Sequence, residues 1–268
     1  MSKGFLWIAQ NNEKTDYMKL SVSLCQSIKK YCKNSQVCVI TDKSTKAPDN
    51  IFDQVIVLEH DDSAGSLWKM SNEWKVFHLS PFIHTIKLEA DMLVNSSLDW
   101  WWNYLCQYDM VFSYHCRDYQ DNIVVESPYR KLFRENRLPD VYNGLHYFRR
   151  SVWANKFFNL CRMIIKNWIY VKENILINCH DSEPTTDVVY ALANKIMDPL
   201  QLKKINFEWF NFIHGKSAIN QIPAVKKLYN YVTPYRIKDK LYLGSYPVNR
   251  IWHYHDKNIL DEIDERTF

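Results

Sequence analysis

The first part of the chain alternates short apolar runs with segments that repeat apolar residues at helical spacing. Strands are expected at residues 5–9, 37–41, 54–58 and 84–88. Residues 17–31 predict a helix with Asp16 as its N-cap, and residues 66–79 predict a second helix. Strands that alternate with helices in this way are typical of a mostly parallel central sheet flanked by helices. Such sheets bind ligands at the carboxyl ends of their strands.

The second part of the chain is less regular. Helices are expected at residues 98–105, 153–169 and 187–196, and strands at residues 110–114 and 144–148. Residues 117–139 are polar and weakly periodic, which predicts a long excursion from the sheet. The last seventy residues mix short strands with loops. Because no repeat or shift in composition marks a boundary, we expect a single α/β domain over residues 1–268.

The composition excludes several classes of protein but does not indicate a function. The chain has 268 residues, 47% of them hydrophobic, and 34 Lys and Arg against 30 Asp and Glu, as in ordinary globular proteins. No apolar run approaches the roughly 20 residues of a membrane-spanning helix, and the first residues do not resemble a secretion signal. Seven cysteines without a CxxC pair fit reduced thiols. We therefore expect a cytoplasmic protein without a membrane partner.

Glycine is scarce and scattered. The chain has five glycines, and none of them are clustered. Both the GxGxxG dinucleotide motif and the GxxxxGK[ST] phosphate loop need clustered glycines, because only then can the backbone approach the phosphates closely. These two nucleotide-binding classes are excluded in their usual form.

Two acidic residues follow the strand expected at residues 84–88. Glu89 and Asp91 are one residue apart, so both side chains can point to the same side of an extended segment. Hard cations such as Mg²⁺ and Mn²⁺ bind a few carboxylates together with phosphate oxygens. The pair therefore indicates either a metal that bridges protein and diphosphate or a solvated strand end.

The apolar strand, Glu89-Ala90-Asp91 and the apolar residues after them resemble the metal-binding motif of GT-A-fold glycosyltransferases, although Asp is commoner than Glu at the first position. That resemblance implies a GT-A-like fold, a metal-dependent enzyme and a UDP-sugar donor. It implies that residues 1–95 form a nucleotide-binding half and residues 96–268 an acceptor and sugar half. The residues implied at the nucleotide and the sugar are Gln10, Asn11, Asp42, Asn143 and Gly144.

Further ligands are expected from the C-terminal segment. Residues 251–254 resemble a His-Tyr/Phe segment whose histidine completes the metal site in some of these families, but the usual following Gly and Lys-Pro-Trp are absent. We prefer His253 to His255 as the third ligand of Mn²⁺ or Mg²⁺. Positive charge for the diphosphate is expected from Lys69, Lys75 and Lys257.

The catalytic carboxylate is expected at the start of the helix at residues 187–196. Asp187 follows two threonines and matches an acidic residue that faces the donor sugar in the family. It is our candidate base for an inverting reaction, with Glu183 and Asp181 as substitutes; in a retaining reaction it would bind sugar hydroxyls. The same Thr-Thr-Asp sequence can also serve only to cap the helix.

Four stretches, at residues 68–74, 87–91, 142–149 and 183–187, resemble more closely a group of glycosyltransferase-like proteins of T-even-like bacteriophages. This resemblance implies transfer of a sugar such as arabinose to 5-hydroxymethylcytosine in double-stranded phage DNA, in the host cytoplasm. Three alternatives stay open: transfer to a glycan, lipid or protein, a metal-dependent phosphoesterase, and a nucleotide- or nucleic-acid-binding module without catalysis.

Overall fold

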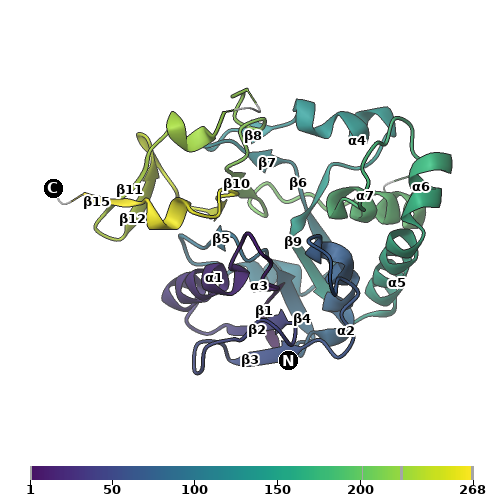
Figure 1. Ribbon diagram of the computed structural model, residues 1–268, viewed down its shortest axis with the longest axis horizontal. Helices are drawn as coiled ribbons and strands as arrows, with labels where there is room; N and C mark the ends of the chain where they lie inside the picture. Colours follow the sequence, from purple (N-terminus) through teal and green to yellow (C-terminus); the bar gives the residue numbers. More distant parts are fainter. Residues whose placement is uncertain (1, 201, 224–225, 267–268) are drawn as a thin grey trace.

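The computed structural model describes residues 2–200, 202–223 and 226–266, and a six-stranded sheet runs through its centre (Figure 1). The strand order is β3-β2-β1-β4-β9-β6. The strands are β1 (Lys3–Ile8), β2 (Gln36–Thr41), β3 (Gln54–Val57), β4 (His84–Lys87), β6 (Met110–Tyr114) and β9 (Val141–Arg149). Only β9 is antiparallel to its neighbours in this sheet, so the prediction of a mostly parallel sheet is confirmed.

Helices cover both faces of this sheet. The first face packs against α1 (Tyr17–Tyr31) and α3 (Trp101–Leu105), and the second against α2 (Val76–Leu79), α5 (Val152–Lys166) and α7 (Thr186–Met197). Successive side chains of a strand point to opposite faces. Accordingly, Phe5 and Trp7 belong to the core under α1, whereas Leu6 belongs to the core under α5 and α7.

The sequence pattern predicted the bounds of α1 correctly but not the structure of the segment after β3. Helix α1 has the predicted bounds, and the Asp16 side chain accepts a hydrogen bond from the Lys19 amide as its N-cap. The predicted helix at residues 66–79 is instead a 3-10 helix, η1 (Lys69–Lys75), followed by the single turn α2. The buried Asn72 side chain forms hydrogen bonds with Ser63 Oγ and with the backbone amide of Asp62. The conformation of this segment therefore depends on contacts with the preceding loop.

The second half departs further from expectation. The excursion at residues 117–139 contains β7 (Cys116–Arg117), β8 (Ile123–Val124), the 3-10 helix η2 (Pro128–Arg130) and α4 (Lys131–Glu135). The helix predicted at residues 153–169 ends at Lys166, and α6 (Trp168–Asn174) follows it. The Asn167 side chain donates a hydrogen bond to the Met163 carbonyl at the break, a local bond that competes with the helix ladder.

The C-terminal part adds two smaller sheets. One has the order β5-β14-β10-β7-β8, with β5 (Met92–Leu93), β10 (Phe212–His214) and β14 (Ile251–His253). The other contains β11 (Pro234–Ile237), β12 (Lys240–Leu243), β13 (Tyr246–Pro247) and β15 (Asp264–Arg266), with the 3-10 helices η3 (Leu228–Asn230) and η4 (Ile259–Asp261) beside it in sequence. In Figure 1, β11, β12 and β15 lie at the opposite end of the molecule from α5 and α6.

The C-terminal sheets share a core with the rest of the chain. Leu20 of α1 and Leu93 of β5 pack in one apolar cluster with Ile213 and Trp252. The predicted single-domain α/β fold is confirmed. Among the residues that the structure describes, no helix has the length and apolar character needed to cross a bilayer.

Candidate active site

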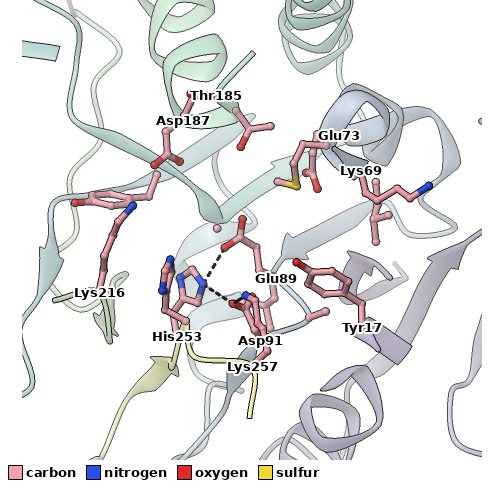
Figure 2. Close-up of a pocket in the computed structure, with 18 of the residues that line it drawn as sticks. Tyr17, Lys69, Glu73, Glu89, Asp91, Thr185, Asp187, Lys216, His253 and Lys257 are labelled. Carbon is pink, nitrogen blue, oxygen red and sulfur yellow. Dashed lines mark hydrogen bonds and ion pairs between the residues drawn. The ribbon is translucent and has the colours of Figure 1, made fainter. Parts of the chain in front are cut away.

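A cavity of about 320 Å³ opens at the carboxyl ends of β1 and β4 (Figure 2). Gln10 follows β1, and Glu89 follows β4. Because β1 and β4 are parallel neighbours, they end at the same edge of the sheet, and both residues line the cavity there. The opposite wall comes from Gly144 of β9 and Asp187 of α7, and His253 of β14 closes one side. The cavity therefore collects residues from segments that lie far apart in the sequence.

The three predicted metal ligands lie together in this cavity. Glu89, Asp91 and His253 offer ligand atoms that all lie within 4.8 Å of one another. His253 Nε2 is 3.0 Å from Asp91 Oδ2 and 3.4 Å from Glu89 Oε2, as the dashed lines in Figure 2 show. Strand pairing explains the meeting, since His253 of β14 lies opposite Met92 of β5. His255 also lines the cavity but is not part of this group.

The donor set fits a hard divalent cation. Two carboxylates and one imidazole nitrogen suit Mn²⁺ or Mg²⁺ when waters or phosphate oxygens complete the coordination. The His253 ring is fixed by stacking on His214, with ring centroids 4.7 Å apart and planes 15° apart. The Lys257 ammonium contacts Asp91 Oδ2, so this cation balances the carboxylate charge at the place where a metal would bind.

Burial and charge shift the acids in opposite directions. Burial raises the pKa of Glu89, and the neighbouring Asp91 adds to that, against the opposing effect of His253 and Lys87. Burial acts in the same direction on Asp91, but His253 and Lys257 outweigh it and hold its pKa well below the usual range. Burial alone would lower the pKa of His253, yet Asp91 and Glu89 raise it. Asp91 is therefore the firmly ionised member of the group.

The opposite wall is held by a buried arginine. Asp187 Oδ1 accepts a hydrogen bond of 2.7 Å from the backbone amide of Asn143, and Oδ2 accepts one of 2.9 Å from the Arg130 guanidinium. Arg130 is 3% exposed, forms a second ion pair of 2.8 Å with Asp140, and stacks on the Tyr142 ring. Asp187 thus lies in the cavity with both carboxylate oxygens already fixed.

Glu183 does not lie with Asp187. Its side chain is exposed and does not line the cavity, which corrects the expectation that it could replace Asp187 as a base. Asp181 is exposed as well and accepts a hydrogen bond from Thr185 Oγ1. Thr185 is the N-cap residue of α7 but makes no side-chain capping bond, and Asp187 lies in the first turn. The Thr-Thr-Asp sequence is therefore more than a helix cap.

Glycine is required at position 144. A Cβ atom there would lie 2.9 Å from Glu89 Oε2 and 3.0 Å from the Met92 methyl group, so β9 approaches the Glu89 carboxylate directly. The neighbouring Asn143 is fully buried and supports this wall from behind, with Nδ2 3.3 Å from Thr186 Oγ1 and 3.4 Å from Glu73 Oε2. Of the Asn143-Gly144 pair expected at the sugar, Gly144 lines the cavity and Asn143 does not.

On the nucleotide side, only Gln10 of the three expected residues lines the cavity. The side-chain nitrogen Nε2 of Gln10 donates to Asp42 Oδ2 and Asp61 Oδ2, both at 3.0 Å. Burial would raise the pKa of Asp42, but hydrogen bonds from Ser44, Gln10 and Thr45 lower it. Asp42 is thus ionised and bonded to Gln10, and it does not line the cavity; its expected contact with the nucleotide stays a prediction.

Asn11 turns away from the cavity to the start of α1. Its side-chain oxygen accepts a hydrogen bond from the Met18 amide, and its side-chain nitrogen donates to Asp16, both at 2.9 Å. The expectation that Asn11 contacts the nucleotide is therefore corrected. Its neighbour Asn12 and the ring of Tyr17 line the cavity instead.

The three expected lysines have different places. Lys69 and Lys257 line the cavity, and the Lys69 ammonium lies 3.1 Å from the Ser63 carbonyl. Lys75 is 8% exposed, donates to Asn72 Oδ1 at 2.8 Å and pairs with Asp62 at 3.3 Å. Lys75 is therefore part of the protein interior, which corrects the expectation that it adds charge beside the diphosphate.

Sequence reasoning missed two features of this site. Glu73 lines the cavity and forms a buried ion pair of 2.8 Å with Lys87 at the end of β4. A lysine inside an apolar strand run was the available signal, because a buried ammonium needs a partner. Lys216, two residues after the end of β10, also lines the cavity, and no pattern in its surroundings distinguished it from a surface lysine.

No protein-family model matches this chain, and no curated protein sequence matches it. Among solved structures, the chain is similar to the galactosyltransferase LgtC, whose crystal structure contains donor and acceptor sugar analogues. The two share 12% sequence identity, the match covers 70% of each chain, and the TM-score is 0.48.

Proposed function

We propose that this protein is a metal-dependent glycosyltransferase that uses a nucleotide sugar of the UDP type. One observation carries the proposal: Glu89, Asp91 and His253 converge in a cavity at the carboxyl ends of parallel strands, opposite Gly144 and Asp187. This is the arrangement that the GT-A-like motif around Glu89 and Asp91 implies, and it adds a third ligand from a distant part of the chain.

The cavity supplies the requirements of glycosyl transfer on two sides. A divalent cation held by Glu89, Asp91 and His253 would neutralise the negative charge that develops on a departing diphosphate. Lys257 and Lys69 add positive charge on that side of the cavity. Tyr17 offers an aromatic ring for stacking against the base.

Asp187 is suited to orienting the donor sugar. Its two oxygens are fixed by Arg130 and by the Asn143 amide, so the carboxylate keeps one position while substrate enters. Fixed hydrogen-bond acceptors orient sugar hydroxyls without a cost of reorganisation. We propose this positioning role in place of the general-base role, because the two existing hydrogen bonds hold the carboxylate in one place while each oxygen keeps a lone pair for a sugar hydroxyl.

Binding of UDP in the presence of Mn²⁺ tests the proposal. We expect calorimetry to show UDP binding that requires Mn²⁺ or Mg²⁺ and is lost in Asp91→Asn. Glu173→Gln on the exposed side of α6 is the matched control and should bind as the wild type does. If the wild-type protein unfolds cooperatively on heating, and is therefore folded, but binds neither metal nor UDP, the proposed function is contradicted.

The finer prediction, transfer of arabinose or another sugar to 5-hydroxymethylcytosine in phage DNA, rests on the sequence resemblance alone. A screen of UDP-sugars, including UDP-arabinose, against hydroxymethylated and unmodified duplexes tests it by mass spectrometry. Sugar addition only to the hydroxymethylated duplex supports the DNA acceptor. UDP release without a DNA adduct favours a glycan, lipid or protein acceptor instead.

The phosphoesterase alternative fits less well. A two-metal hydrolytic site needs further carboxylates or histidines beside the first group. Within the described part of the chain, Glu89, Asp91 and His253 form the single group of three such ligands. Hydrolysis of nitrophenyl phosphate esters with Mn²⁺ is the measurement that would revive this alternative.

A further inference from the structure

Lys216 lies in the cavity beside the wall formed by Asp187. It belongs to the turn after β10, lines the cavity, and is partly buried. Its ammonium lies 3.4 Å from the centroid of the Tyr129 ring, and Figure 2 shows its side chain extending toward Asp187. Its role is not part of the mechanism described above, which uses the metal ligands, Lys69 and Lys257.

The backbone around Lys216 is fixed. The Gly215 amide donates to the His253 carbonyl at 2.8 Å, and the Lys216 amide donates to His214 Nδ1 at 3.3 Å. The Lys216 carbonyl accepts hydrogen bonds from the Ile219 amide and the Asn220 side chain. A Cβ at Gly215 would lie 2.5 Å from the Tyr254 carbonyl oxygen, so this turn is closely packed. Lys216 therefore projects from a defined position.

The Lys216 ammonium differs from the other cations of the cavity in lacking an oxygen partner. Lys257 pairs with Asp91, and Lys69 donates to a backbone carbonyl. Among the described residues, the Lys216 ammonium has no hydrogen-bond acceptor and no carboxylate within 4.0 Å, only the face of Tyr129. Water can serve its three donors while the cavity is open, but a substrate that fills the cavity displaces that water and must supply an acceptor.

The nearby Asp187 does not satisfy this ammonium. Its Oδ2 is paired with Arg130, and its Oδ1 accepts the Asn143 amide. Arg130 pairs with both Asp187 and Asp140, so it reduces the negative charge that would repel an anion from this wall. The wall thus presents a cation with free donors next to a carboxylate that is already paired.

We propose that Lys216 recognises an anionic group, a carboxylate or phosphate, on the sugar that enters this side of the cavity. Charge-assisted hydrogen bonds to an anionic oxygen are the strongest contacts that a partly buried ammonium can make. The inference rests on the proposed glycosyl transfer and makes the enzyme selective for an acidic sugar over its neutral analogue. The acidic group can belong to the donor sugar or to the acceptor.

Calorimetry with paired ligands tests the inference and separates the two sources. In the donor arm, UDP-glucose and UDP-glucuronic acid are titrated with Mn²⁺ present. In the acceptor arm, methyl glucoside and methyl glucuronide are titrated into protein saturated with UDP and Mn²⁺. We expect the acidic member of one pair to bind roughly tenfold or more tightly than the neutral member.

Variants assign that preference to the ammonium. Lys216→Met is expected to remove the preference while leaving the affinities for UDP and the neutral sugar unchanged, and Lys216→Arg to retain most of it. Lys166→Met on the exposed end of α5 is the matched control. Thermal unfolding of each variant separates loss of binding from loss of folding.

Two results overturn the inference. One is a wild-type protein that prefers neither acidic ligand, which needs no variant to establish. The other is a Lys216→Met variant that loses affinity for UDP itself as strongly as for the acidic sugar, since the ammonium would then contact the diphosphate. UDP binding without an acidic preference contradicts this inference alone, whereas absence of metal-dependent UDP binding contradicts the proposed function as well.

Discussion

The two walls of the cavity hold their charges differently. On the side of the proposed metal site, called the metal side below, Glu89 and Asp91 face His253 and Lys257 across short distances inside the cavity itself. On the side of the proposed sugar site, called the sugar side below, the main ion pairs lie behind the surface, where Arg130 is 3% exposed. The first set of charges can exchange partners when a cation or a phosphate arrives. The second set is a fixed support that holds one carboxylate in place.

This difference separates binding from support. A substitution on the metal side is expected to change what the cavity binds and to cost less stability, because the Lys257 side chain is 28% exposed and its charge stays hydrated without a partner. A substitution in the support of the sugar side is expected to change folding first, because a buried charge is left without its partner. Four substitutions or conditions test this distinction, and they are taken from the largest expected effect to the smallest.

Arg130→Met should have the largest effect on stability. It leaves Asp140 and Asp187 without their common partner, and removing one member of a buried ion pair costs about 3–5 kcal/mol. Chemical denaturation measures the free energy of unfolding directly. Arg134→Met in α4 is a control at a more exposed position. Equal stabilities of the two variants would contradict the assignment of Arg130 as the support of this wall.

Asp91→Asn should act on binding instead. It removes a charge from the metal group, and losing one such electrostatic contact typically costs about 10²–10³ in rate. Metal affinity is measured by Mn²⁺ titration, and transfer by UDP release. We expect a large loss of both and, because Asp91 is itself buried against His253 and Lys257, a loss of unfolding free energy that is smaller than that of Arg130→Met. A variant with normal Mn²⁺ affinity would remove Asp91 from the site.

The contrast also explains how much of the site was predictable from sequence. Glu89 and Asp91 follow a regular apolar strand, so local pattern sufficed to place both at the sheet edge. The bounds of α1 were equally local, because the Asp16 cap and the apolar spacing fix them. The resemblance to a known motif added His253, whose approach to Asp91 depends on the pairing of β5 with β14.

The sugar side could not be predicted in the same way. Arg130 lies in the irregular segment between β8 and β9, where no periodicity shows which side chains point inward. Asn11 and Lys75 were expected at the nucleotide, but the direction of a side chain in a turn or a 3-10 helix depends on contacts with distant loops. Those contacts become visible only when the fold is known.

Gly144→Ala tests where the two walls touch. The added methyl group would lie 2.9 Å from Glu89 Oε2, so the carboxylate must shift. We expect roughly tenfold weaker Mn²⁺ binding, as when a group that orients a metal ligand is altered, together with about 1–3 kcal/mol of destabilisation from overpacking. Gly65→Ala is the contrasting substitution, because its Cβ would meet no atom within 4 Å and only its positive φ is strained. Unchanged Mn²⁺ affinity in Gly144→Ala would show that the walls act independently.

The smallest expected effect is a pH dependence confined to the sugar side. Burial lowers the pKa of Lys216 to about 8, with Arg130 acting in the same direction and Asp187 against it. Its charge is therefore present below that pH and lost as the pH rises through it. The groups that face Lys216 are Tyr129, Arg130, Asp187, His214 and His255.

We expect the ratio of affinities for UDP-glucuronic acid and UDP-glucose to be constant near pH 7 and to fall, by up to roughly tenfold, between pH 7 and pH 9. Changes in metal or diphosphate binding affect both ligands alike and cancel in this ratio. Lys216→Met should show a ratio near one at every pH, and Lys216→Arg a ratio that stays high to pH 9, because guanidinium remains charged there. A wild-type ratio that does not change with pH would mean that the ammonium does not contact the acidic sugar. Arg130 would then be the remaining evidence that the two walls have different roles.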